Sequence, residues 1–184
     1  MLVTLSGLPG SGTSTVARGA AAELGLDHVD GGTVFRTVAA EQGLSLAAYA
    51  ALAEHDEKID RALDDRLTER AHRGDVLLES RLSGWLATRA SLESLCVWIR
   101  CDEAERARRV AERDGQDAGM ALAHNQQRER SERARYLRYY DIDLTNLTIY
   151  DLVLDSTEAS PPDLVAAVVS AAKHRPDHPA GTDR

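Results

Sequence analysis

A glycine-rich turn near the amino terminus constrains this chain more than any other feature. Residues 7–14 match the phosphate-binding pattern G-x-x-x-x-G-K-[ST] at every position except the lysine, where Thr13 stands. Glycines let successive backbone N–H groups turn toward a phosphate without a Cβ in the way. The flanks fit as well, because residues 2–6 predict a buried strand and residues 14–24 an amphipathic helix. The sequence therefore predicts a strand, a phosphate cradle and a helix.

The missing lysine leaves two interpretations open. Such a lysine normally reaches the β- and γ-phosphates, while the hydroxyl that follows it holds Mg²⁺, and Ser14 retains that hydroxyl. Either the chain binds a nucleotide without turnover, or arginines from elsewhere supply the charge. The composition favours the second interpretation, because lysine occurs only at positions 58 and 173 whereas ten arginines fall between positions 100 and 138.

The overall charge limits the possible partners. The formal net charge is −8, and affinity for a phosphate backbone needs a basic surface, so we expect no nucleic-acid partner. No apolar run approaches the ~20 residues that span a bilayer, so we expect no membrane partner and a cytoplasmic location. Cys96 and Cys101 lack the spacing of a metal site or a disulfide framework, and we expect reduced thiols.

Short apolar segments alternate with helical ones along the chain. Beyond the first strand, the pattern predicts strands at 28–30, 75–79, 95–99 and 152–154. Beyond the first helix, it predicts helices at 33–42, two within 45–73 broken around 55–56, two within 102–139 broken near 114–119, and one at 161–173. This alternation predicts an α/β domain over residues 1–174 whose parallel sheet is covered on both faces, followed by a disordered tail at 175–184.

Further sequence blocks occur at characteristic spacing. They are DGGTVFR at 30–36, ESRLSGW at 79–85, RERSE at 128–132, RY at 135–136, YDID at 140–143 and IYDLV at 149–153. With residues 7–15, these blocks resemble the archaeal-type cytidylate kinases, which are small P-loop nucleoside monophosphate kinases, over nearly the whole chain. Threonine in place of the P-loop lysine is familiar in that family. Ser80 and Asp141 depart from it, because they stand where glycine is usual.

The resemblance implies a three-layer P-loop kinase fold with a five-stranded parallel sheet. It also implies an acceptor-nucleotide region at about 31–73, a helical arginine-rich lid at about 102–139, and ATP-dependent phosphorylation of a nucleoside monophosphate, CMP or dCMP foremost. We expect a monomer that acts on small-molecule nucleotides. The residues expected to bind ATP are Gly7, Pro9, Gly10, Ser11, Gly12, Thr13, Ser14 and Thr15, with Mg²⁺ held at Ser14.

The acceptor phosphate needs bidentate donors, for which arginine is suited. The resemblance points to Arg36 and Arg81 for this role. Ligands of open α/β sheets bind at the carboxyl ends of the strands, which independently indicates Arg81 and Glu79. The residues expected to bind the acceptor are Gly31, Gly32, Phe35, Arg36, Glu79, Arg81 and Glu132.

The predicted lid places arginines on helical faces. Arg106, Arg109 and Arg113 recur at i, i+3 and i+7. Arg128, Glu132 and Arg135 recur at i, i+4 and i+7, the spacing of an Arg-x-x-x-Asp-x-x-Arg run in bacterial cytidylate kinases. We expect Arg109, Arg128 and Arg135 to be catalytic, and Glu132 either to orient an arginine or to read the base or sugar of the acceptor.

Two rival functions stay open. The chain could phosphorylate a different monophosphate or a metabolite with a cytidylyl-like group, as the departures at Ser80 and Asp141 permit. It could also be a non-catalytic ATP sensor, which the absent lysine suggests; arginines on two sides of the site argue against this, because a sensor needs no acceptor pocket. We expect the tyrosines at 136, 139 and 140 to pack the lid against the core rather than to stack on a base.

Overall fold

Five parallel strands form the centre of the structure, a computed structural model that describes residues 1–175. The strands are β1 (Leu2–Gly7), β2 (Asp27–Asp30), β3 (Val76–Glu79), β4 (Leu95–Arg100) and β5 (Leu152–Asp155). Their order across the sheet is β2-β3-β1-β4-β5, and every neighbouring pair is parallel. The five-stranded parallel sheet predicted from the sequence is confirmed. The tail predicted at 175–184 lies, apart from its first residue, outside the described residues.

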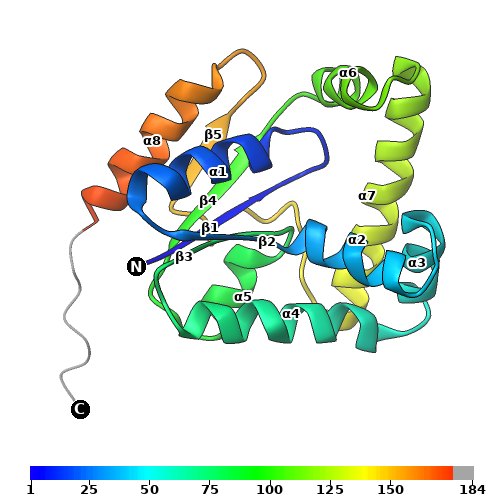
Figure 1. Ribbon diagram of the computed structural model, residues 1–184, viewed down its shortest axis with the longest axis horizontal. Helices are drawn as coiled ribbons and strands as arrows, with labels where there is room; N and C mark the ends of the chain where they lie inside the picture. Colours follow the sequence, from blue (N-terminus) through cyan, green and yellow to red (C-terminus); the bar gives the residue numbers. More distant parts are fainter. Residues whose placement is uncertain (176–184) are drawn as a thin grey trace.

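Helices cover both faces of this sheet (Figure 1). They are α1 (Thr13–Leu24), α2 (Gly31–Glu41), α3 (Leu46–Ala53), α4 (Glu57–His72), α5 (Ser83–Arg89), α6 (Glu103–Asp114), α7 (Ala118–Tyr140) and α8 (Pro161–Lys173). None of the helices in residues 1–175 combines the length and apolar composition that crossing a bilayer requires.

Alternating side chains of the strands build two separate cores. Val3, Leu5 and Val97 are buried with Val16 of α1 and Val168 of α8 in one cluster. The intervening residues of β1 and β3 face the other way and are buried with α4 and α5; this second cluster contains Leu2, Val76, Leu78, Leu67 and Ala87. Because successive strand residues point to opposite faces, one sheet can support a helical layer on each side.

The helix boundaries agree with the sequence except in two places. Helix α2 begins at Gly31, two residues earlier than predicted, because the Asp30 side chain caps it by accepting a hydrogen bond from the Gly32 N–H at 2.8 Å. Helix α5 was not predicted; it has only seven residues and contains Gly84, so its sequence carries little helical pattern. The break between α3 and α4 is confirmed, with Asp56 as the N-cap of α4.

Candidate functional site

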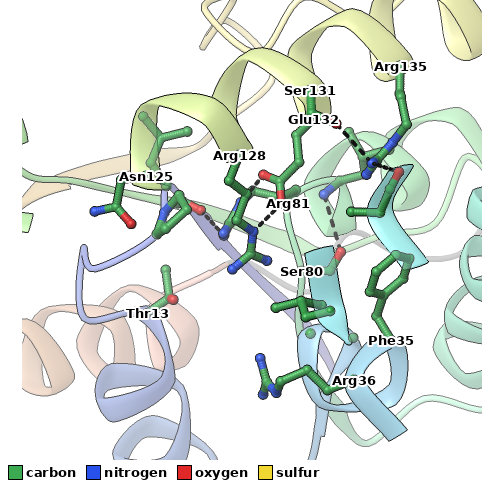
Figure 2. A pocket seen from close by; sticks show the side chains of 18 of the residues that line it. Thr13, Phe35, Arg36, Ser80, Arg81, Asn125, Arg128, Ser131, Glu132 and Arg135 are labelled. Carbon is green, nitrogen blue, oxygen red and sulfur yellow. Dashed lines mark hydrogen bonds and ion pairs between the residues drawn. The ribbon is translucent and has the colours of Figure 1, made fainter. Parts of the chain in front are cut away.

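A cavity of about 590 Å³ lies at the carboxyl ends of β1 and β3. The glycine-rich turn lines one end, and residues of α2, α3 and α4 line the other. Helix α7 runs along the cavity and contributes side chains to both ends, as Figure 2 shows for Asn125 through Arg135. The arrangement can hold an elongated ligand, or two ligands end to end, against a single helix.

Backbone geometry explains the glycines of the turn. Gly10 and Gly12 have φ angles of 82° and 84°, in the left-handed region that favours glycine. A Cβ at Gly7 would lie 2.7 Å from the carbonyl oxygen of Ile99, and one at Gly10 would lie 2.6 Å from that of Arg106. The backbones of Ile99 and Arg106 cannot move away without disturbing their own elements, so the turn closes only with glycine at these positions.

The residues expected to bind ATP are placed differently around this turn. The following residues line the cavity: Gly7, Pro9, Gly10, Thr13 and Ser14. Ser11 is buried beneath the turn, and Thr15 is exposed on the first turn of α1. Helix α1 begins at Thr13, which places the positive end of its dipole at the turn.

Ser14 joins a chain of polar side chains that crosses three elements. Its hydroxyl donates to Oε1 of the buried Glu79 at 2.5 Å. The other carboxylate oxygen of Glu79 lies 3.0 Å from Nε2 of His28 on β2. A hydroxyl beside a carboxylate oxygen fits Mg²⁺, which prefers oxygen ligands and commonly binds through one or two protein groups plus substrate phosphates.

Arg81 lies between the glycine-rich turn and helix α7. Its guanidinium donates to the carbonyl oxygen of Gly7, and its Nε donates to Oε2 of Glu132 at 2.8 Å. Oε1 of Glu132 accepts from Nε of Arg128 at 2.7 Å. Burial alone would raise the pKa of Glu132, but the charges of Arg81 and Arg128 outweigh it and lower that pKa to about 2. Glu132 is therefore an anion that holds two guanidinium groups.

The amino-terminal end of α2 borders the cavity. Arg36 lines it with a 51% exposed side chain and donates to Thr33 Oγ1 at 2.7 Å. Gly31 and Gly32 precede it, and a Cβ on Gly31 would lie 3.1 Å from Cβ of Ser80. Phe35 also lines the cavity. The four residues predicted on α2 therefore lie at one edge of the site.

Of the three predicted arginines of α6, Arg113 lines the cavity, whereas Arg106 and Arg109 point to the loops around the glycine-rich turn. Arg106 is buried, donates to the carbonyl oxygen of Pro9 at 3.2 Å and pairs with Glu129 of α7. Arg109 does not line the cavity; it donates to the carbonyl oxygen of Ser156 at 2.6 Å, and its Nη1 lies 3.6 Å from a Cβ built on Gly12. The structure thus places Arg109 behind the glycine-rich turn, outside the cavity.

The two predicted arginines of α7 diverge. Arg128 is half-buried and lies toward the Thr13 end of the cavity, whereas Arg135 lies toward the opposite end (Figure 2). Arg135 is buried and pairs with Asp60 of α4, with 2.9 Å between Nε and Oδ2. The structure brings Arg81, Glu132 and Arg128 together with the turn, and it does not bring Arg109 or Arg135 to the same place.

Two carboxylates of α4 were missed by the sequence reasoning. Asp60 and Asp64 are buried and line the cavity. Asp64 accepts a hydrogen bond from the Tyr140 hydroxyl at 2.6 Å, and burial raises its pKa to about 7. Both occupy the stripe that Leu67 and Ala71 continue at helical spacing. Acidic residues inside an apolar stripe were the available indication.

The tyrosines of helix α7 pack against the core, as predicted. Tyr136 is buried with Leu82 and Ile142. The Tyr139 hydroxyl donates to the carbonyl oxygen of Ala53 at 2.8 Å, and the Tyr140 hydroxyl to the buried Asp64. These contacts fasten the carboxyl-terminal half of α7 to α3 and α4.

Comparisons with known proteins agree with this geometry. A protein-family model described as an AAA domain matches residues 3–137. The chain is 44% identical over 172 residues to the cytidylate kinase of Halobacterium salinarum, covering 93% of this chain and 88% of that one. It is 40% identical over 174 residues to the cytidylate kinase of Pyrococcus horikoshii, covering 95% and 89%.

Solved structures resemble the chain at the level of the fold. An uncharacterized protein from Eubacterium ventriosum superposes with a TM-score of 0.73 at 15% identity, covering 95% of this chain and 99% of that one. Shikimate kinase from Bacteroides thetaiotaomicron superposes with a TM-score of 0.55 at 13% identity, covering 94% and 96%. The likeness shows the three-layer P-loop kinase fold.

Proposed function

The chain belongs to the cytidylate kinase family, and we propose that it transfers the γ-phosphoryl group of ATP to CMP or dCMP. One observation carries the proposal: a single cavity has a phosphate-binding turn at one end, and between the two ends a pair of arginines held by a shared buried carboxylate, Glu132. A protein that only bound ATP would have no use for the second half of this cavity.

The donor triphosphate belongs on the glycine-rich turn. The backbone N–H groups of the turn and the amino terminus of α1 would hold the β- and γ-phosphates. We propose that Mg²⁺ binds with ATP beside Ser14 and Glu79, where it would neutralise phosphate charge. His28, on the far side of Glu79, would keep that carboxylate turned toward Ser14.

Arg81 and Arg128 suit the charge that moves during transfer. An oxygen of the acceptor phosphate attacks the γ-phosphorus, the bond from that phosphorus to the β,γ-bridging oxygen breaks, and ADP leaves with the bond's electron pair. Positioning and electrostatic stabilisation supply most of the rate in such reactions. Because Glu132 fixes both guanidinium groups in advance, no ordering is needed at the moment of transfer.

Arg36 is the proposed second contact of the acceptor phosphate, since its exposed guanidinium lines the cavity from the α2 side. Arg109 is proposed to act on the donor side through the Ser156 loop. We also propose a cytoplasmic monomer without a nucleic-acid partner. The net charge of −8 supports the last point.

A coupled ADP-release assay with CMP, dCMP, UMP and AMP tests this proposal. We expect the highest kcat/KM with CMP or dCMP, and activity that requires added Mg²⁺. Tight ATP binding without transfer to any monophosphate in a single-turnover experiment would establish the sensor instead. Preference for another acceptor would establish the first rival.

A further inference from the structure

The end of the cavity farthest from the glycine-rich turn contains a buried ion pair. Asp60 of α4 and Arg135 of α7 are joined at 2.9 Å between Oδ2 and Nε, with side chains only 5% and 6% exposed. Both residues line the cavity. Figure 2 shows Arg135 well away from Thr13, so the pair lies where an acceptor nucleotide would place its base rather than its phosphate.

The pair keeps polar atoms unused by the protein. Nη1 of Arg135 makes only long hydrogen bonds, at 3.4 Å to the carbonyl oxygen of Ala50 and 3.3 Å to Ser131 Oγ. Within residues 1–175, neither Nη2 of Arg135 nor Oδ1 of Asp60 takes part in a hydrogen bond, and neither atom is fully enclosed by protein. Because both residues line the cavity, these two atoms are the ones left to bind a ligand there.

The walls around the pair suit a flat ring. Phe35, Ala50, Leu63 and Tyr136 line the same end of the cavity. Aromatic and aliphatic walls accept the two faces of a nucleobase, and the polar edge of that base then needs hydrogen-bonding partners. Glu132 cannot serve, because Arg81 and Arg128 occupy its two oxygens.

We propose that Asp60 and Arg135 read the edge of the acceptor's cytosine: Asp60 accepts from the exocyclic amine, and the Arg135 guanidinium donates to the ring nitrogen and carbonyl oxygen beside it. This inference rests on the proposed function. An ionised carboxylate can only accept hydrogen bonds and a guanidinium can only donate them. Uracil reverses the match, because its O4 acceptor would face Asp60 and its ring N–H would face Arg135.

Asp60→Asn tests the assignment, because an amide can donate to O4 of uracil. We expect kcat/KM with CMP to fall about 10- to 100-fold relative to UMP, the discrimination that one good bidentate contact provides. The dissociation constant for ATP, measured by equilibrium binding, should stay within about twofold, since Asp60 lies away from the turn. The matched control is Asp65→Asn, an exposed aspartate on the same helix, which should leave the CMP-to-UMP ratio unchanged.

An unchanged CMP-to-UMP ratio in Asp60→Asn with intact ATP binding overturns the inference. If that variant fails to bind ATP, Arg135→Lys retains the charge and loses the planar fork, and an unchanged ratio there overturns the inference equally. Calorimetric binding of CMP and UMP to the wild type and to Asp60→Asn separates the two proposals. A wild type that phosphorylates no monophosphate but binds CMP through Asp60 contradicts the kinase function alone.

Discussion

Arg81 and Glu132 are 51 positions apart in the sequence and form a buried ion pair with 2.8 Å between Nε and Oε2. The pair connects the carboxyl end of β3 to the middle of helix α7. Because Arg81 also donates to the Gly7 carbonyl oxygen, the same guanidinium touches the phosphate-binding turn. Arg81 thus joins helix α7 to the glycine-rich turn.

Glu132→Gln should disable this attachment. An amide keeps the shape of the side chain but cannot balance two guanidinium charges, so Arg81 and Arg128 should separate. We expect kcat to fall at least about 10-fold, and the free energy of unfolding to drop by roughly 3–5 kcal/mol, the cost of breaking a buried ion pair. Steady-state kinetics and urea unfolding measure the two effects. Glu112→Gln, on the exposed side of α6, is the control and should behave as wild type.

Arg81→Ala should act on the acceptor. Its guanidinium lies at the carboxyl end of β3, between the turn and the acceptor half of the cavity, so its loss should raise the apparent KM for CMP more than that for ATP. We expect about a 10- to 100-fold increase, as for the loss of a charge-assisted hydrogen bond of about 1.5–3 kcal/mol. An unchanged KM for CMP would contradict the role. Arg89→Ala, on α5 and outside the cavity lining, provides the control.

Asp64 makes stability depend on pH. Its pKa is raised by burial from 3.8 to about 7, so the folded state binds one proton more than the unfolded state between these pH values. This contribution is complete below pH ~4 and is lost as pH rises through 7. At ~1.4 kcal/mol per unit, the loss between pH 5 and pH 7 is roughly 3 kcal/mol.

Asp64→Asn should remove that loss while its amide oxygen still accepts from Tyr140. Urea unfolding at pH 5 and pH 8 measures the difference, and the variant should have the flatter dependence. Asp65→Asn should retain the wild-type slope, because that side chain is exposed. Equal slopes in Asp64→Asn and wild type would mean that Asp64 is ionised in the folded protein at pH 5.

The local parts of the fold could be predicted, and the pairing of side chains could not. The turn at residues 7–12 can be recognised in the sequence because its φ angles near 80° at Gly10 and Gly12 require glycine. The strands can be recognised by their apolar runs. The arginines of the lid were recognised by their spacing. Spacing alone cannot predict that Arg106 donates to the carbonyl oxygen of Pro9, because Pro9 belongs to a distant segment. The contact of Arg128 with Glu132 lies within one helix and fits the i, i+4 spacing.

The acceptor end of the cavity was the least predictable part. Asp60 and Asp64 share a helical stripe with Leu67 and Ala71, but they stand among many charged residues in a mostly polar helix, so the stripe alone is a weak signal that these carboxylates are buried. Helix α5 was missed for a related reason: seven residues that include a glycine form a helix because Gly84 lets Tyr150 pack against them, with 2.7 Å between a built Cβ and the ring.

Thr13 allows the most direct test of how charge is neutralised. Arg128→Ala should lower kcat about 100-fold with a smaller effect on ATP affinity, because its guanidinium is proposed to stabilise the transferring phosphoryl group. Arg133→Ala, exposed on the same helix, is the control.

If arginine supplies the positive charge that the P-loop lysine normally provides, Thr13→Lys should restore part of that charge. The loss of kcat/KM caused by Arg128→Ala should then be smaller in the Thr13→Lys background than in the wild type. A double-mutant cycle on kcat/KM measures this coupling. Additive effects would show that position 13 and Arg128 act on different steps. The hypothesis that distant arginines replace the P-loop lysine would then have to be abandoned.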